Sequence, residues 1–164
     1  MKQLLFITNL ANKIGSFSLS SIAAAKTLGY GYHSAANWSA AQPGQIEQDE
    51  EKYGIFIHNV DMDRAPLSKK NLAVYRKIKK LIQDEKVDYI HCNTPTGGLL
   101  GRLAGKKCGV KKVIYQVHGF HFYKGAPKKN WLIYYPIERI LACWTDAIIT
   151  INHEDYAFAQ KKLK

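Results

Sequence analysis

The sequence predicts an α/β domain in which a mainly parallel sheet is covered by helices on both faces. Short, continuously apolar runs alternate with helical stretches along the 164 residues, and no repeat or low-complexity tract interrupts them. Strands that are buried on both faces of a parallel sheet have this unbroken apolar pattern. A chain of this length can bury one good core, so we expect one domain.

Six segments are predicted to be strands, because each is a short apolar run with polar or glycine-containing stretches on either side. The segments are 4–8 (LLFIT), 32–38 (YHSAANW), 55–60 (IFIHNV), 87–93 (VDYIHCN), 111–119 (KKVIYQVHG) and 146–152 (DAIITIN). The polar stretch 39–54, SAAQPGQIEQDEEKYG, is predicted to be a loop or a short irregular excursion.

Helices are predicted between these strands. The stretch 16–28 is rich in small residues and ends before Gly29, which suits the position after a helix. Ser68 is a plausible N-cap for a helix that runs to about Lys86, with apolar residues at three- and four-residue steps. TPTGGLLGRLAGKKCG is predicted to be a loop entering a small-residue helix. A helix over 129–144 that Pro136 starts or kinks follows, and a last helix begins near His153.

The charge balance favours a polyanionic partner. The chain has 24 Lys and Arg against 13 Asp and Glu, which gives a net charge of +11. Nucleic acid, an anionic membrane surface and phosphorylated substrates all fit such an excess, and the charge alone does not choose among them.

Neither a secretory signal nor a membrane span is predicted. The apolar run of MKQLLFITNL stops at Asn9, which makes it too short for a signal peptide. The stretch 131–144 is interrupted by Pro136, Glu138 and Arg139 and is too short to span a bilayer. We therefore expect a soluble chain, or one attached to a membrane at its surface. The cysteines have no CxxC spacing and are predicted to be reduced thiols in a cytosolic protein: Cys92, Cys108 and Cys143.

In parallel α/β sheets, ligands bind outside the carboxyl ends of the strands. This rule selects the polar residues that follow each apolar run, namely Thr8–Asn9, Asn37–Trp38, His91–Thr94, His118–Gly119 and Thr150–Asn152. The first turn lacks the GxGxxG pattern of dinucleotide enzymes, so Gly15 either contacts a ligand or simply turns the chain.

The segment TPTGGLLGRLAG is a second candidate, because free amides at a helix start favour an anion or sugar hydroxyls. Thr94, Thr96, Gly97 and Gly98 are the candidates there, with close helix packing as the alternative for the glycines. For Gly101 and Gly105 we expect that packing role, and Arg102 is predicted to lie at the surface.

The histidines show neither HExxH nor another compact ligand spacing, so no metal site is predicted. His118, at a strand end beside Gly119, suits hydrogen bonding or proton handling, or it is a structural histidine. No GxSxG elbow or Ser–His–Asp order is present.

Two basic clusters could meet an anionic membrane, because basic residues beside amphipathic aromatics suit its interface. The alternative is that the basic residues form a solvated helix face and the aromatics belong to the core. The sequence contains no recognisable nucleic-acid-binding motif. The clusters contain Lys69, Lys70, Arg76, Lys77 and Lys80, and then Lys128, Lys129 and Trp131.

Three long motifs resemble a known family. The segments 88–105 (DYIHCNTPTGGLLGRLAG), 113–142 (VIYQVHGFHFYKGAPKKNWLIYYPIERILA) and 145–161 (TDAIITINHEDYAFAQK) are similar to the N-terminal half of bacterial family 4 glycosyltransferases. The kinship is with members that build capsular, exopolysaccharide or lipid-linked glycans. LLFITNL, GYHSAANWS and RAPLSKKNL fit the same pattern, so the resemblance covers nearly the whole chain.

The resemblance implies a GT-B enzyme of two Rossmann-like domains that face each other across a cleft, with retaining, metal-independent hexosyl transfer. It implies that residues 1–164 are the N-terminal, acceptor-side domain and that His118 lies near the transferred sugar. The acceptor side would be lined by the first loop and by the TPTGG segment, that is Asn12, Gly15, Ser16, Thr94, Gly97 and Gly98, together with Gly119.

The sequence departs from the family pattern at two positions and in length. Asn93 replaces the second histidine of HCHTP, and His153 replaces a glutamate of NEED, although Glu154 and Asp155 remain. The donor-binding half is expected to lie outside the 164 residues, in a separate chain or lost by truncation. No cofactor is expected beyond the nucleotide-sugar donor, which that half would bind.

The leading interpretation is therefore an acceptor-side domain that is not active alone, working on a lipid-linked or oligosaccharide acceptor in cell-surface polysaccharide biosynthesis. The alternative is a non-catalytic glycan-binding or membrane-docking module. Binding to nucleic acid is not expected. The resemblance implies a cytoplasmic location, with or without peripheral attachment to the inner face of the cell membrane.

Overall fold

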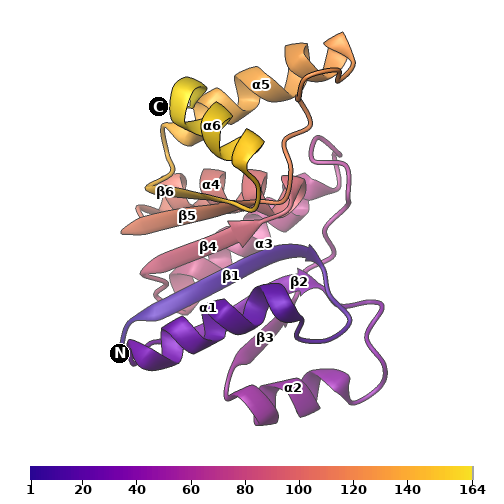
Figure 1. Ribbon diagram of the computed structural model, residues 1–164. Coiled ribbons are helices and arrows are strands. Elements are labelled where there is room, and N and C mark those ends of the chain that lie inside the picture. Colours follow the sequence, from indigo (N-terminus) through magenta and orange to yellow (C-terminus); the bar gives the residue numbers. More distant parts are fainter. Residues whose placement is uncertain (164) are drawn as a thin grey trace.

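The computed structural model describes residues 1–163 and has three layers, with a six-stranded sheet between two layers of helices (Figure 1). The strand order is β3-β2-β1-β4-β5-β6, and every neighbouring pair is parallel. The predicted α/β class is confirmed, and the sheet is parallel throughout. The strands are β1 (Gln3–Leu10), β2 (Gly31–Asn37), β3 (Phe56–Asn59), β4 (Tyr89–Asn93), β5 (Lys112–Val117) and β6 (Ala147–Thr150).

A helix follows each strand, as right-handed crossovers between parallel strands require. The helices are α1 (Ser16–Thr27), α2 (Gln45–Tyr53), α3 (Asn71–Asp84), α4 (Pro95–Cys108), α5 (Lys128–Ala142) and α6 (His153–Lys162). In Figure 1, α1 lies in front of the sheet and α3 and α4 lie behind it, with α5 and α6 toward the β6 end. Pro136 lies inside α5, which begins at Lys128, so it does not start the helix. Within residues 1–163, no helix is both long and apolar enough to cross a membrane.

The alternation of side chains along β1 divides the core in two, because successive residues of a strand point to opposite faces. Leu5 and Ile7 join the larger core, which continues into α3 through Ile78. Leu4 and Phe6 join the smaller core, which includes residues of α1 and α2. The unbroken apolar run LLFI is therefore explained by burial on both faces.

The prediction of a loop over 39–54 is wrong, because Gln45–Tyr53 forms α2. Its polar composition suggested a solvated loop, but two of its acidic side chains fasten the helix to neighbouring backbone. An oxygen of Asp49 accepts a hydrogen bond from the Ile14 amide at 2.8 Å, and an oxygen of Glu50 accepts one from the Ile57 amide at 2.7 Å. Gly54, with φ 62°, ends the helix in the left-handed conformation that glycine adopts without strain.

The prediction of Ser68 as an N-cap is also wrong, because α3 begins at Asn71. The Ser68 hydroxyl donates to Asp63 at 2.9 Å instead. The Asn71 carboxamide accepts from the Asp63 amide at 3.0 Å and donates to the Ala65 carbonyl at 2.9 Å. These bonds close the loop 61–70 on itself before the helix starts, so the helix begins two residues later than an N-cap at Ser68 predicts.

The small residues of α4 let the helix lie directly on the sheet, as predicted for Gly101 and Gly105. A Cβ atom on Gly101 would stand 2.8 Å from the Cβ of Cys92, and one on Gly105 would stand 2.8 Å from a methyl carbon of Val113. Neither distance is sterically acceptable, so the packing role is confirmed. The predicted loop before this helix is absent, since α4 begins at Pro95 directly after Thr94.

The prediction that Arg102 lies at the surface is wrong, because its side chain is 0 % exposed. Two parallel bonds join its guanidinium to Glu138 of α5, at 2.7 and 2.9 Å, and its Nε donates to the Gly98 carbonyl at 2.9 Å. The guanidinium also lies over the Tyr115 ring, 3.7 Å from its centroid. The packing of α5 over α4 buries Arg102. No local sequence pattern predicts the contact between Arg102 and Glu138.

We expect Arg102→Met to destabilise the domain by about 3–5 kcal/mol, because it leaves the Glu138 carboxylate charged and unpaired in a nearly dry site. Urea unfolding followed by circular dichroism measures the loss. The exposed Arg139→Met in α5 is the matched control and should change stability by no more than about 0.5 kcal/mol. A loss below about 1 kcal/mol for Arg102→Met would contradict the structural role assigned to the pair.

Candidate functional site

The candidate site lies at the carboxyl edge of the sheet, where β1 and β4 are neighbours. The strand order reverses direction between these two strands, and the connections that follow them leave toward opposite faces. Such a switch point opens a crevice outside the strand ends, where open α/β sheets bind their ligands. The first loop (11–15), Thr94 and His118 all follow strands that end at this edge.

His118 directly follows β5 and is partly buried. Its ring meets the Phe17 ring edge-on, with centroids 4.3 Å apart and an interplanar angle of 81°. Phe17 lies in the first turn of α1, so the fold brings His118 beside the first loop, as the prediction of a shared site requires. Burial lowers the pKa of His118, and a neutral imidazole presents one donor nitrogen and one acceptor nitrogen at neutral pH.

The loop after His118 is held by the start of α6. Gly119 has φ 123°, a conformation that other residues rarely adopt. The Phe120 amide donates to the buried carboxylate of Asp155 at 3.5 Å. Asn152 caps α6 by accepting from the Asp155 amide at 2.8 Å and donating to the Asp155 carboxylate at 2.7 Å. Asp155 is therefore a positioning residue that the sequence interpretation did not assign, although N-x-x-D at a helix start is its signal.

The first loop is anchored by its neighbours. The bond from the Ile14 amide to Asp49 ties it to α2, and the Ala11 amide donates to the Asn37 carbonyl at 3.0 Å. Asn12 and Ser16 are exposed, and the space around the Cβ position of Gly15 is open to 4 Å. The residues of this loop that are predicted to bind the sugar acceptor thus lie at the carboxyl edge. No atom blocks the approach of a ligand to the Cβ position of Gly15 within 4 Å.

Thr94 joins β4 to α4 with a strained backbone. Its φ of 62° and ψ of 158° lie in a region that costs a residue with a side chain about 1–3 kcal/mol, and such strain concentrates at functional sites. The Thr94 side chain accepts a hydrogen bond from the Gly97 amide at 3.4 Å, and its carbonyl accepts from the Gly98 amide at 2.8 Å. The next threonine, Thr96, donates to the Arg64 carbonyl at 2.9 Å and so holds the loop 61–70 against the start of α4.

Gly97 and Gly98 are buried, and neighbouring atoms leave no room for a side chain at either position. A Cβ on Gly97 would stand 3.1 Å from the Ile7 carbonyl oxygen, and one on Gly98 would collide with the Tyr115 ring. The alternative of close helix packing therefore holds for both glycines. Direct contact of either with an acceptor stays a prediction.

Asn93 adds an unexpected polar group to the edge. The residue is buried, and its side-chain oxygen has no hydrogen-bond partner among residues 1–163. Such an orphaned acceptor costs about 1–3 kcal/mol, which a ligand hydroxyl or a water would recover. The sequence marked this position as a strand end and as a departure from the family pattern, without giving it a role.

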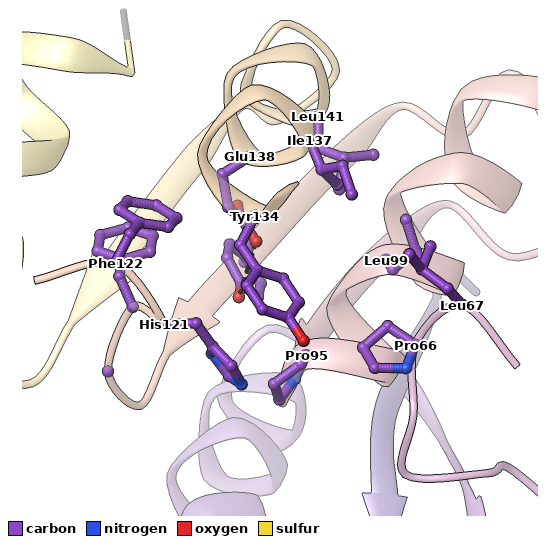
Figure 2. Close-up of a pocket in the computed structure, with 13 residues that line it drawn as sticks. Pro66, Leu67, Pro95, Leu99, His121, Phe122, Tyr134, Ile137, Glu138 and Leu141 are labelled. Atoms are coloured by element: carbon purple, nitrogen blue, oxygen red, sulfur yellow. Dashed lines mark hydrogen bonds between the residues drawn. The ribbon is translucent and has the colours of Figure 1, made fainter. Parts of the chain in front are cut away.

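An apolar pocket opens beside the same edge, between the loop 61–70, α4 and α5 (Figure 2). Gly119, His121 and Phe122 border it, so it adjoins the segment that carries His118. The His121 ring lies against the Tyr134 ring, with centroids 4.7 Å apart. The other side chains that line it are largely hydrocarbon, and they include Pro66, Leu67, Pro95, Leu99, Ile137 and Leu141.

The predicted basic surfaces are exposed, but Trp131 is not. Lys69, Lys70, Arg76, Lys77 and Lys80 are exposed in and before α3, and Lys128 and Lys129 are exposed at the start of α5. Lys80 pairs with Asp84 at 2.8 Å. Trp131 is half-buried, with its ring centroid 5.6 Å from that of Phe122 and 5.8 Å from that of Phe158. The core alternative thus applies to Trp131, and the exposed apolar residues of α5 are Leu132, Ile133 and Ile140.

His91 lies on β4 and is built into the smaller core side of the sheet. Its ring nitrogens lie 3.0 Å from the Ser21 hydroxyl and 3.1 Å from the Gln116 carboxamide oxygen, and its ring meets Phe6 edge-on. Burial lowers its pKa, the bond to Gln116 opposes this in part, and the nearby His118 lowers it further. The folded state therefore holds the His91 proton less readily than the unfolded chain does.

We expect the domain to lose stability as the pH falls from about 6.5, the pKa of an unfolded histidine, toward the lower folded-state pKa of His91. The sign follows because the unfolded state binds more protons in this window. Urea unfolding on either side of it measures the loss, and His91→Leu should make the loss smaller. The exposed His153→Leu is the control and should leave it unchanged; an identical loss in His91→Leu would refute the assignment to His91.

The fold defines a Rossmann-like domain, and the candidate ligand site lies at its switch point. Residues 39–152 match the glycosyl transferase 4-like family. The chain belongs to this family, and the resemblance stated from its motifs is confirmed.

Two curated sequences are similar to this chain over part of their own length. The chain is 43 % identical over 161 residues to EpsD of Bacillus subtilis (strain 168), a protein assigned as a glycosyltransferase, and covers 97 % of its own length but 40 % of EpsD. It is 32 % identical over 100 residues to the UDP-Gal:alpha-D-GlcNAc-diphosphoundecaprenol alpha-1,3-galactosyltransferase of Escherichia coli, covering 57 % of this chain and 26 % of that protein. The chain thus spans less than half the length of these relatives.

Solved structures share the fold at low sequence identity. A glycosyltransferase from Rickettsia africae ESF-5 matches 99 % of this chain and 40 % of its own, with a TM-score of 0.64 and 14 % identity. A UDP-N-acetylglucosamine 2-epimerase matches 99 % of this chain and 45 % of its own, with a TM-score of 0.62 and 12 % identity. These similarities confirm the domain type of GT-B proteins.

Proposed function

We propose that this domain forms the acceptor side of a glycosyltransferase of cell-surface polysaccharide biosynthesis. The reaction would move a sugar from a nucleotide-sugar donor to a lipid-linked or oligosaccharide acceptor. The observation that carries the proposal is the position of His118 at the carboxyl edge of the sheet, in a chain that belongs to the glycosyl transferase 4-like family. The 43 % identity to EpsD supports the transferase class, and the name of the E. coli relative specifies a UDP-sugar donor and a lipid-diphosphate acceptor.

In this proposal the neutral His118 ring bonds to the transferred sugar. A partly buried imidazole with one donor and one acceptor nitrogen suits a sugar hydroxyl, and burial strengthens that bond. Phe17 limits the rotation of the ring, and Asp155 fixes the loop that follows it. Asn12, Gly15, Ser16, Thr94 and Gly119 would line the acceptor path around it.

The nucleotide of the donor would be bound mainly by a second, C-terminal domain, in the same chain or in a separate one. A GT-B site has two walls, and the carboxyl edge described here offers one of them. The coverage of 40 % of EpsD and 40 % of the Rickettsia structure supports this division. The chain 1–164 alone is then not expected to transfer sugar.

Sugar transfer tests the proposal directly. The C-terminal part of EpsD is supplied to this chain, fused or as a separate polypeptide, with UDP-sugars and an undecaprenyl-diphosphate-linked N-acetylglucosamine acceptor. We expect label in the lipid fraction only when both parts are present. His118→Ala should lower turnover by about 10–100-fold, because it removes the hydrogen bond to the transferred sugar, which is worth about 1–3 kcal/mol when a buried partner is lost.

His121→Ala is the matched control, since it removes a nearby exposed imidazole, and it should retain turnover. Full activity of the His118→Ala enzyme would overturn the role of His118. Turnover by residues 1–164 alone would overturn the need for a second domain. Absence of transfer from every donor tried would count against the transferase function and leave the non-catalytic alternative.

The lipid part of the acceptor is supported by the surface of α5. Leu132 is 77 % exposed, and Ile133 and Ile140 are also exposed on a helix that begins with Lys128 and Lys129. Exposed apolar residues with adjacent lysines suit the interface of an anionic bilayer. We propose peripheral attachment to the inner face of the cell membrane through this helix, with the basic residues of α3 as a second contact.

Vesicle sedimentation tests the attachment. Each lysine near an anionic surface contributes about 1 kcal/mol, so Lys128→Gln/Lys129→Gln should weaken binding to anionic vesicles by about thirtyfold. Lys106→Gln/Lys107→Gln, in the last turn of α4, is the control of equal charge and should bind more tightly than the α5 variant. Equal binding of the unmodified protein to neutral and anionic vesicles would refute the proposal.

A further inference from the structure

Two histidines and a glutamate meet at the side of the domain remote from His118. His33 lies early in β2, His58 in the edge strand β3, and Glu85 directly after α3. One ligand atom from each lies within 4.8 Å of the other two. The residues are far apart in sequence and only the sheet brings them together, which is why the sequence showed no compact ligand spacing.

One ring nitrogen of His33 points toward a ring nitrogen of His58. The Nδ1 of His33 and the Nε2 of His58 are 3.0 Å apart. Two nitrogen ligands of a tetrahedral zinc ion, each at about 2.0–2.1 Å, stand about 3.3–3.4 Å apart, so a small outward shift would admit the ion. The Glu85 carboxylate supplies a third ligand, and two imidazoles with one carboxylate are a set that Zn²⁺ accepts.

The neighbours of His33 orient it for this purpose. Its Nε2 lies 3.2 Å from the Gln3 carboxamide oxygen, which accepts a hydrogen bond from that nitrogen. The proton is then on Nε2, and the Nδ1 lone pair points toward His58. Metal-binding histidines usually have their second nitrogen fixed by such an acceptor. The Phe56 ring, with its centroid 5.1 Å from that of His33, packs against the imidazole.

The state of the histidines also suits a metal. A histidine binds metal through the lone pair of its neutral form. Burial is the largest influence on both rings, and it lowers the pKa of His33 and of His58. His33 is buried, whereas His58 and Glu85 are partly exposed, which leaves a path for the ion and for a water as fourth ligand.

We propose that His33, His58 and Glu85 form a zinc site that fastens the edge strand β3 and the end of α3 to β2. The ion would act on the fold, since the cluster lies at the β2–β3 side of the sheet while His118 follows β5, beyond β1 and β4. Within residues 1–163, β3 has a neighbouring strand on one side only, so an additional attachment has a structural use there.

Titration of the metal-free chain with Zn²⁺ alone, followed by calorimetry, tests the site, and Co²⁺ reports its geometry through the intense visible bands of tetrahedral coordination. We expect one ion per chain and a higher Tm with Zn²⁺. His58→Gln and Glu85→Gln should each weaken binding by at least about tenfold, since even the loss of an outer-shell group has that effect. His153→Gln, an exposed histidine in α6, should bind as the unmodified chain does.

Circular dichroism of the metal-free variants checks that they fold, which is expected because His58 and Glu85 are partly exposed. No binding of Zn²⁺ to the unmodified chain, an octahedral Co²⁺ spectrum, or undiminished affinity in both variants would overturn the proposal. None of these readouts depends on sugar transfer, so the zinc site and the proposed function fail or succeed separately.

Discussion

The close approach of α4 to the sheet is the constraint on which the rest of the structure depends. Gly97 and Gly98 let the first turn of the helix lie on β1 and on the Tyr115 ring, and Gly101 and Gly105 continue the contact along β4 and β5. Because the helix lies this low, Arg102 reaches under α5 to Glu138 and is sealed from water. The strained turn at Thr94 directly precedes this helix, at the switch point. The glycines of α4 thus set the packing of the core and also the position of the turn at the candidate site.

The edge that carries His118 is held by bonds from distant parts of the chain. Asp49 of α2 fixes the first loop, Thr96 fixes the loop 61–70, and Asp155 of α6 fixes the segment after β5. All three are side-chain contacts to backbone, which set the course of a loop without occupying the space in front of it. A site of this kind stays open for a ligand while its walls are rigid, as preorganised binding requires.

The sequence predicted what depends on local pattern. Strand positions, the α/β class and the placement of His118 and Thr94 at strand ends follow from apolar runs and from the rule for parallel sheets. The helix α2 was missed because its acidic residues bond to backbone of other elements, which composition does not reveal. Arg102 was misplaced because a charged residue is buried only when a partner elsewhere meets it, here Glu138. The pairing of His33 with His58 likewise needed the register of β2 and β3. When the role of a residue depends on one contact with a residue distant in sequence, the local sequence pattern does not predict that role.

The strand order has a consequence for how the domain is made. β1 is in the middle of the sheet, yet its second neighbour, β4, begins only at Tyr89. A ribosome adds roughly 5–20 residues per second, so β1 and β2 with their helices wait on the order of several seconds for β4. During that interval the backbone groups on the β4 side of β1 have no partner strand, and Leu5 and Ile7 on its face are uncovered until α3 and α4 pack against them. The half-made sheet is therefore the state most exposed to aggregation, and the nascent chain would benefit from a chaperone at that stage.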